Sequence, residues 1–195
     1  MASARPVAVL DACVLVPRAL RDLLLSCADT GVFRPVWEHE IEDEMIRNQV
    51  RLDVEKGRDK DGCLVAAEHA RDQMNRAFPD ARLRTEVWVP LVGQMTNATK
   101  DRHVLAAAVG SGASRLVTLN LRDFPDRSLP SGIEVQHPDR FLLDQLARDE
   151  YAVISALVAM AGRHVRAPRS PAALAQAFAS GQFVPRFGAA VLDKI

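Results

Sequence analysis

Short apolar runs alternate with longer segments of helical periodicity along this chain, and no other feature restricts its fold as strongly. Four runs have the length and composition of strands, namely residues 7–10, 33–37, 115–119 and 133–135. Strands that alternate with helices form βαβ units, and the strands of such units run parallel. We therefore expect an α/β fold, a three-layer α/β/α sandwich with a mainly parallel central sheet.

Segments with apolar residues at three- and four-residue spacing predict the helices of this fold, and they are residues 18–28, 38–52, 64–78, 101–109 and 138–147. A further apolar run, residues 87–92, is expected to form another strand. Beyond residue 147 the pattern is wholly helical. We therefore predict an α/β domain over residues 1–147 and a helical C-terminal extension over residues 148–195.

The formal net charge of the 195 residues is zero, because 25 basic side chains match 25 acidic ones. This balance excludes a binding protein that works by bulk positive charge. Aromatic residues make up only 5% of the chain, which is too few for a platform that stacks nucleic-acid bases. The extension is mildly basic and the rest of the chain mildly acidic, so an acidic site is expected in the α/β domain.

The three cysteines are odd in number and have no CxxC spacing. This argues against a disulfide framework or a zinc site, and it favours a reducing cytoplasm. Asp11 interrupts the apolar start of the chain, so a signal peptide is not expected. The longest apolar stretch, residues 151–161, is far below the roughly 20 residues that span a bilayer. We therefore expect no membrane association.

Several carboxylates lie in apolar surroundings, where an unpaired acid is costly. Asp11 directly follows the first expected strand, Asp101 begins an expected helix, and Asn120 and Asp123 follow the run 115–119. The carboxyl ends of parallel strands share one edge of a sheet, so these side chains are expected to meet there. Each of these residues also has a purely structural explanation. Asp11 and Asp101 could cap the helices that follow them, and Asn120 and Asp123 could form Asx turns.

The helix expected from residue 38 offers one further candidate. At about 100° per residue, Glu44 lies roughly 20° outside the apolar stripe, whereas Glu40, Glu42 and Asp43 point further out and are expected to be solvated. The alternative for Glu44 is a rim carboxylate in water. The same projection turns His103 about 200° away from Asp101.

Carboxylates that converge at one edge repel one another unless a cation neutralises them. Mg²⁺ and Mn²⁺ prefer such hard oxygen ligands, and an acidic metal site suits phosphodiester cleavage.

Five segments, taken in order, resemble the PIN-domain nuclease family, in particular its VapC-type ribonuclease toxins from bacterial toxin–antitoxin pairs. They are residues 9–15, 37–45, 100–108, 116–125 and 133–142. The resemblance covers roughly residues 5–147.

This resemblance implies Mg²⁺ or Mn²⁺ held by four acids, with a polar helper at position 120; the residues are Asp11, Glu44, Asp101, Asp123 and Asn120. It also implies endoribonuclease action on RNA, such as tRNA, through a metal-activated water, a cognate antitoxin, and a homodimer. The sequence departs from many relatives at two positions. Lys100 is basic where acids often precede the aspartate, and Asn120 stands where an aspartate is common. Both differences lower the negative charge and weaken the case for a second metal.

Two other functions remain open. A non-catalytic RNA-binding or scaffold version of the fold would follow from reduced metal affinity. A phosphatase or phosphoacceptor domain is disfavoured, because one such class needs an aspartate where Cys13 stands. RNA phosphates could be met by arginines near the acids or in the extension, namely Arg18, Arg47, Arg102, Arg122, Arg163, Arg166 and Arg169.

Overall fold

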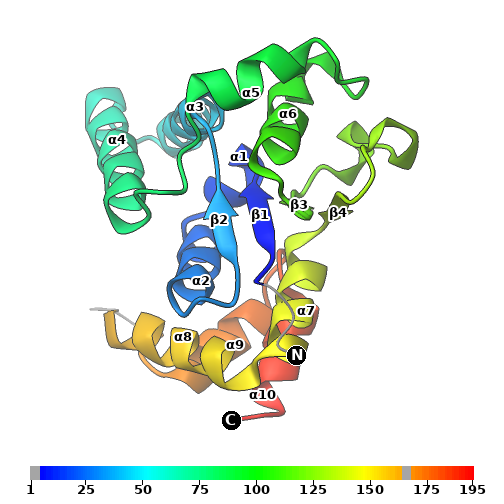
Figure 1. The fold of residues 1–195 in the computed structure, drawn as a ribbon. Helices are drawn as coiled ribbons and strands as arrows, with labels where there is room; N and C mark the ends of the chain where they lie inside the picture. The colour runs from blue at the N-terminus through cyan, green and yellow to red at the C-terminus, as the bar shows by residue number, and fades with distance from the viewer. Residues whose placement is uncertain (1–4, 164–167) are drawn as a thin grey trace.

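Four short strands form one sheet at the centre of the computed structural model, which describes residues 5–163 and 168–195 (Figure 1). They are β1 (Val7–Leu10), β2 (Arg34–Val36), β3 (Arg115–Val117) and β4 (Glu134–Gln136). Their order is β2-β1-β3-β4, and every neighbouring pair is parallel. The central strand β1 places Val9 beside Val36 on one side and Leu116 on the other. Its continuous apolar run matches a strand covered on both faces.

The helices in the described residues are α1 (Ala12–Leu15), α2 (Arg18–Asp29), α3 (His39–Glu55), α4 (Lys60–Ala77), α5 (Thr85–Val92), α6 (Arg102–Ser111), α7 (Pro138–Arg148), α8 (Glu150–Arg163), α9 (Pro171–Ala179) and α10 (Pro185–Leu192). Short 3-10 turns are η1 (Thr99–Asp101), η2 (Leu121–Asp123) and η3 (Asp126–Ser128). Helix α6 packs on β1 and β3, α2 packs on β2, and α8 packs on α2. The predicted α/β class with a parallel sheet is confirmed.

The expected strand at residues 87–92 is wrong, because this segment lies in α5. Only Trp88 of α5 is buried, while Val87 and Val89 are exposed, so the burial pattern is not that of a central strand. Helix α5 packs closely on α6, and a Cβ added at Gly110 would lie 2.5 Å from the Val87 carbonyl oxygen. A helix satisfies its backbone hydrogen bonds internally, so this segment needs no neighbouring strand.

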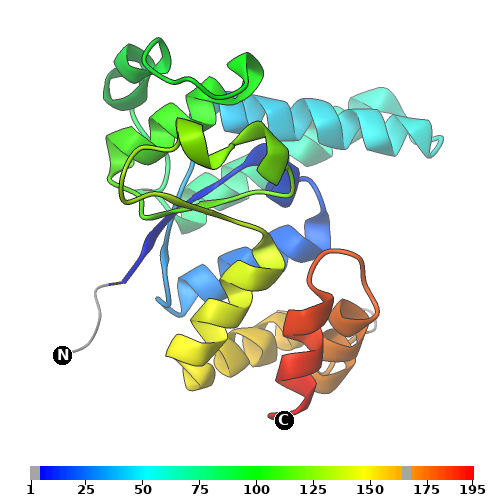
Figure 2. The same cartoon turned by 90° about the vertical axis from the view of Figure 1, so that its right-hand side faces the viewer.

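Helices α3 and α4 form a hairpin that extends to one side of the molecule, and α7 to α10 gather at the other end (Figure 2). The four C-terminal helices pack on one another, with α10 against α7 and α9, and α8 against α7 and α9. The buried Asp139 of α7 accepts a 2.8 Å hydrogen bond from the Phe187 amide of α10. The predicted boundary at residue 147 falls at the end of α7 and stays a prediction. No helix within the described ranges is long and apolar enough to cross a membrane.

Candidate metal centre

Asp11 is fixed at the end of β1 by the neighbouring strand. Its amide donates to the Val117 carbonyl over 3.1 Å. Its carboxylate oxygen Oδ2 accepts hydrogen bonds from Thr118 Oγ1 at 2.6 Å and from Cys13 Sγ at 3.1 Å. Asp11 stands at the N-cap of α1, yet its side chain makes no capping bond. The capping alternative is therefore excluded, and the carboxylate belongs to a polar cluster that joins β1 to β3.

Thr118 and Cys13 were not predicted as site residues. Thr118 is fully buried, and its Oγ1 also accepts a hydrogen bond from the Asn120 amide at 3.0 Å. The strand register explains why Thr118 lies here. Leu10 pairs with Val117, so the next residue, Thr118, lies opposite Asp11. Burial, with the charge of Asp11, raises the pKa of the Cys13 thiol well above its usual range. Cys13 therefore stays protonated and serves as a donor.

Asp101 is the acid with the most unusual environment. It ends η1 and stands at the N-cap of α6, again with no capping bond from its side chain. The residue is 7% exposed, and its buried Oδ2 accepts no hydrogen bond. Burial raises the pKa of Asp101 to about 6; Lys100 opposes this, while the charges of Asp123, Asp11 and Glu44 add to it. Asp101 thus lies within electrostatic reach of the other three predicted acids.

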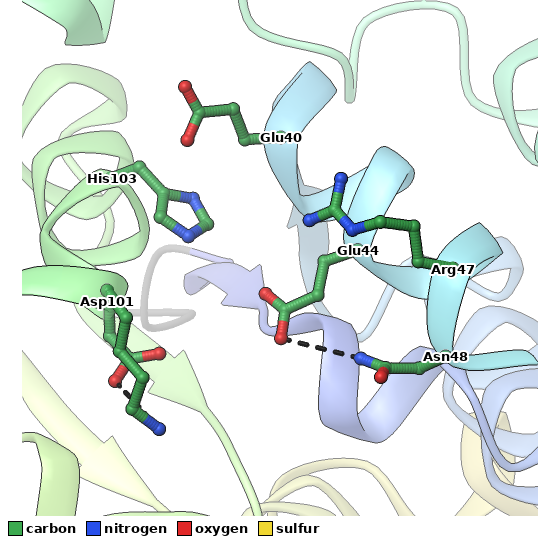
Figure 3. Close-up of a pocket in the computed structure, with 7 residues that line it drawn as sticks. Glu40, Glu44, Arg47, Asn48, Asp101 and His103 are labelled. Atoms are coloured by element: carbon green, nitrogen blue, oxygen red, sulfur yellow. Dashed lines mark hydrogen bonds and ion pairs between the residues drawn. The ribbon is translucent and has the colours of Figure 1, made fainter. Parts of the chain in front are cut away.

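A pocket of about 360 Å³ separates Asp101 from helix α3 (Figure 3). The α3 side contributes Glu40, Glu44, Arg47 and Asn48, and the opposite side contributes Lys100, Asp101 and His103. Glu44 is half-buried and accepts a long hydrogen bond of 3.5 Å from Asn48. Figure 3 shows its carboxylate directed into the space between α3 and Asp101. Its placement beside the apolar stripe, as the helical projection predicted, brings it to this pocket.

Asp123 reaches the cluster through Lys100. Turn η2 ends at Asp123, whose Oδ2 lies 2.9 Å from Lys100 Nζ. The same ammonium lies 3.5 Å from Asp101 Oδ2. Asn120 is exposed, and its amide rather than its side chain is the group bound to Thr118. A role for the Asn120 side chain stays a prediction.

His103 lines the pocket, although the helical projection directed it away from Asp101. Its Nδ1 lies 2.8 Å from the Oε1 atom of Glu38, which is fully buried and caps α3. Burial lowers the pKa of His103, but the hydrogen bond to Glu38 and its charge raise it more, so the net pKa lies above the usual value. The projection failed because Asp101 lies in a 3-10 turn, where 100° per residue does not apply.

Glu42 was expected to be solvated, and this is wrong. Its side chain is buried, accepts a 2.6 Å hydrogen bond from Asn75 of α4, and pairs with Arg82 at 2.9 Å. Helix α4 covers the face of α3 that a single-helix projection leaves open to water. A long-range partner of this kind leaves no signal in the sequence near Glu42.

The arginines considered for RNA contact differ in their surroundings. Arg47 lines the pocket. Arg18 pairs with the buried Asp53 at 2.7 Å, and Arg102 donates to the Asn97 carbonyl over 3.4 Å. Arg122 and Arg169 are exposed, and Arg163 donates a hydrogen bond to Ser26. Arg166 lies outside the described residues. Arg47 is therefore the best placed of them.

Comparisons with known proteins relate parts of the chain to VapC-type proteins. Residues 138–193 match the VapC50 C-terminal domain family. A curated protein of Mycobacterium tuberculosis (strain ATCC 25618 / H37Rv), named “Putative ribonuclease VapC50”, is 45% identical over 100 residues, which is 51% of this chain and 58% of that protein. The resemblance to VapC-type proteins is confirmed. This chain spans a little over half the length of that relative, and no solved structure matches it.

The VapC50 C-terminal match begins with the first residue of α7 and ends just after α10. It thus covers the helices that gather at one end of the molecule, whereas the predicted extension begins ten residues later, at 148. The C-terminal helices are therefore the part of the chain that is similar to the VapC50 C-terminal domain family.

The site's donors fit a hard divalent cation. Carboxylate oxygens are the ligands that Mg²⁺ and Mn²⁺ prefer, and Asp101 Oδ2 is a buried oxygen with no hydrogen-bond donor. Among the described residues, no group of three or more His, Cys, Asp or Glu side chains is drawn together closely enough to hold a metal ion. The ligand set of four acids therefore stays a prediction.

Proposed function

We propose that this chain is a divalent-metal-dependent endoribonuclease and the toxin of a toxin–antitoxin pair. The observation that carries the proposal is Asp101, a buried carboxylate at the pocket. Its Oδ2 accepts no hydrogen bond and lies 3.5 Å from Lys100 Nζ, and its pKa is raised in part by three other acids. Perturbed acids in a pocket are typical of functional sites. The name of the VapC50 relative, a ribonuclease, supports the RNA substrate.

Asp11, Glu44, Asp101 and Asp123 would hold the cation, which supplies a water of lowered pKa and stabilises negative charge at phosphorus. The protein's own groups prepare this site. Thr118 and Cys13 orient the Asp11 carboxylate through its Oδ2 atom.

A second pair of residues ties together the two helices that flank the pocket. Glu38 at the start of α3 binds His103 of α6, and this bond holds the helix that bears Glu44 beside the turn that bears Asp101. Such supporting contacts typically change metal affinity or activity by about 10–100-fold.

RNA is the proposed substrate, with Arg47 at the pocket rim as a phosphate contact. The same proposal includes an antitoxin protein as partner, a homodimer and a cytoplasmic location, because VapC-type proteins are the toxins of toxin–antitoxin pairs.

The proposal is tested by incubating the purified chain with total RNA and with tRNA, in Mg²⁺, in Mn²⁺ and in chelator. Discrete metal-dependent cuts are expected from the wild type. Asp11→Asn and Asp101→Asn should each lower cleavage by more than about 100-fold, the upper end for supporting residues. Asp43→Asn is the matched control, because Asp43 is an exposed acid of α3 outside this pocket. Folded wild type that cuts neither RNA would contradict the proposal.

A non-catalytic RNA-binding protein is the second candidate, and Lys100 favours it. The ammonium of Lys100 already contacts Asp101 and Asp123 and offsets part of their charge. This candidate predicts RNA binding that weakens with salt and leaves the RNA intact, and it predicts that Asp11→Asn changes neither property.

A further inference from the structure

Lys100 is a cation that the fold places inside the acidic cluster. Its Nζ lies 2.9 Å from Asp123 Oδ2 and 3.5 Å from Asp101 Oδ2. The two acids end separate turns, η1 and η2, which are also joined by a 3.4 Å hydrogen bond from the Ala98 amide to the Asp123 carbonyl. The ammonium therefore bridges two turns that carry proposed metal ligands.

The position of this ammonium matters for the number of cations that the site can hold. Two divalent ions that act together on a phosphodiester lie about 3.5–4 Å apart and share carboxylate ligands. Lys100 Nζ contacts the oxygens of two of the four acids that a second ion would need. Its positive charge also offsets one of the four carboxylate charges that would hold two ions.

We propose that Lys100 takes the place of a second divalent cation, so that the site holds one Mg²⁺ or Mn²⁺ together with this ammonium. The inference rests on the proposed function. The single ion would be held chiefly by Asp11, Glu44 and Asp101, and Lys100 would position Asp123. An ammonium has three donors, so Lys100 can bind both acids and also donate to a phosphate oxygen of the RNA.

An ordinary surface ion pair is the alternative explanation. The Lys100 side chain is 69% exposed, and exposed ion pairs contribute little to stability. An ion pair with only that role would leave the number of bound metal ions unchanged when Lys100 is replaced. Metal stoichiometry therefore separates the two explanations without any measurement of activity.

The experiment is a titration of the purified full chain with Mn²⁺, in which the electron paramagnetic resonance signal of free Mn²⁺ gives the number bound. Wild type is compared with Lys100→Met, which keeps the length but not the charge, and with Lys100→Arg, which keeps the charge. Lys60→Met is the matched control, because Lys60 is exposed at the start of α4 and does not line the pocket.

Wild type, Lys100→Arg and Lys60→Met should each bind one Mn²⁺ per chain. Lys100→Met should bind a second ion, with an affinity at least roughly tenfold higher than any second equivalent in wild type. Two ions in wild type, or one ion in Lys100→Met, would overturn this inference and leave the nuclease proposal standing. A folded wild type that binds no Mn²⁺ would instead overturn the proposed metal-dependent function itself.

Discussion

At the scale of single residues, the carboxylate of Asp11 accepts hydrogen bonds at its Oδ2 atom from the buried Thr118 and the half-buried Cys13. Thr118 is the closer of them, and Cys13 contacts both the carboxylate and the Thr118 hydroxyl. A buried acceptor that loses its donor carries the full cost of its desolvation. The arrangement therefore ties the orientation of Asp11 to the stability of the strand ends.

Thr118→Val tests this dependence, because valine keeps the shape of threonine and removes the hydroxyl. We expect the free energy of unfolding to fall by about 1–3 kcal/mol, since Asp11 Oδ2 and the Asn120 amide both lose a partner. Urea denaturation measures this loss, and Thr118→Ser, which keeps the hydroxyl, should recover most of it. Equal midpoints for wild type and the valine variant would show that the bond contributes nothing.

The pair of His103 and Glu38 makes stability depend on pH. The pKa of His103 is raised in the folded state, so the folded chain binds this proton more tightly than the unfolded chain. The stabilisation is complete below the unfolded pKa of about 6.5 and is lost as the pH rises through the folded value. The urea midpoint should therefore drop as the pH rises above about 6.5, and His103→Gln should abolish that drop. If wild type and His103→Gln show the same fall in urea midpoint, the pH dependence comes from groups other than His103.

At the scale of elements, the strands were predictable because short, fully buried parallel strands are continuous apolar runs. Each observed strand overlaps an expected run, although β4 lies one residue later than expected. Helix α1 was missed, since four residues are too few to show helical periodicity. The segment of α5 was misassigned because its apolar run could equally be a buried strand or a helix packed on α6.

The candidate site was predictable only where the signal is local. Asp11, Asp101 and Asp123 follow from their places beside strands and turns, and the three were expected near one another for that reason. The burial of Glu42 and the place of His103 depend on α4 and on the turn η1. Contacts between distant segments of this kind cannot be read from the periodicity of one helix.

The close contact between α5 and α6 gives a prediction for Gly110. Gly110→Ala places a Cβ against the Val87 carbonyl, so we expect the helices to shift and the chain to lose about 1–3 kcal/mol of stability. Gly162→Ala is the control, because this position in α8 has open space around it. There the substitution should be neutral or stabilise by up to about 1 kcal/mol. Thermal unfolding measures both, and a Gly110→Ala midpoint at or above wild type would contradict the packing described.

At the scale of the whole molecule, one apolar core runs from the sheet into the C-terminal helices. The same cluster includes Val9 of β1, Leu157 of α8 and Val191 of α10. Helix α8 packs on α2, which itself packs on β2. The C-terminal helices are therefore expected to unfold together with the α/β part in a single transition.

Asp139→Ala tests this cooperativity from the C-terminal helices, which contain none of the proposed metal ligands. The change leaves the buried Phe187 amide without its acceptor, so stability should fall by about 1–3 kcal/mol. Both tryptophans, Trp37 and Trp88, lie in the α/β part, so their fluorescence reports on that part, whereas far-ultraviolet circular dichroism reports on all helices. If the core is continuous, the two urea transitions coincide and shift together, while Asp193→Ala, at an exposed acid just after α10, leaves them in place. A fluorescence midpoint that stays at the wild-type value while the dichroism midpoint falls would mean that the C-terminal helices fold as a separate unit.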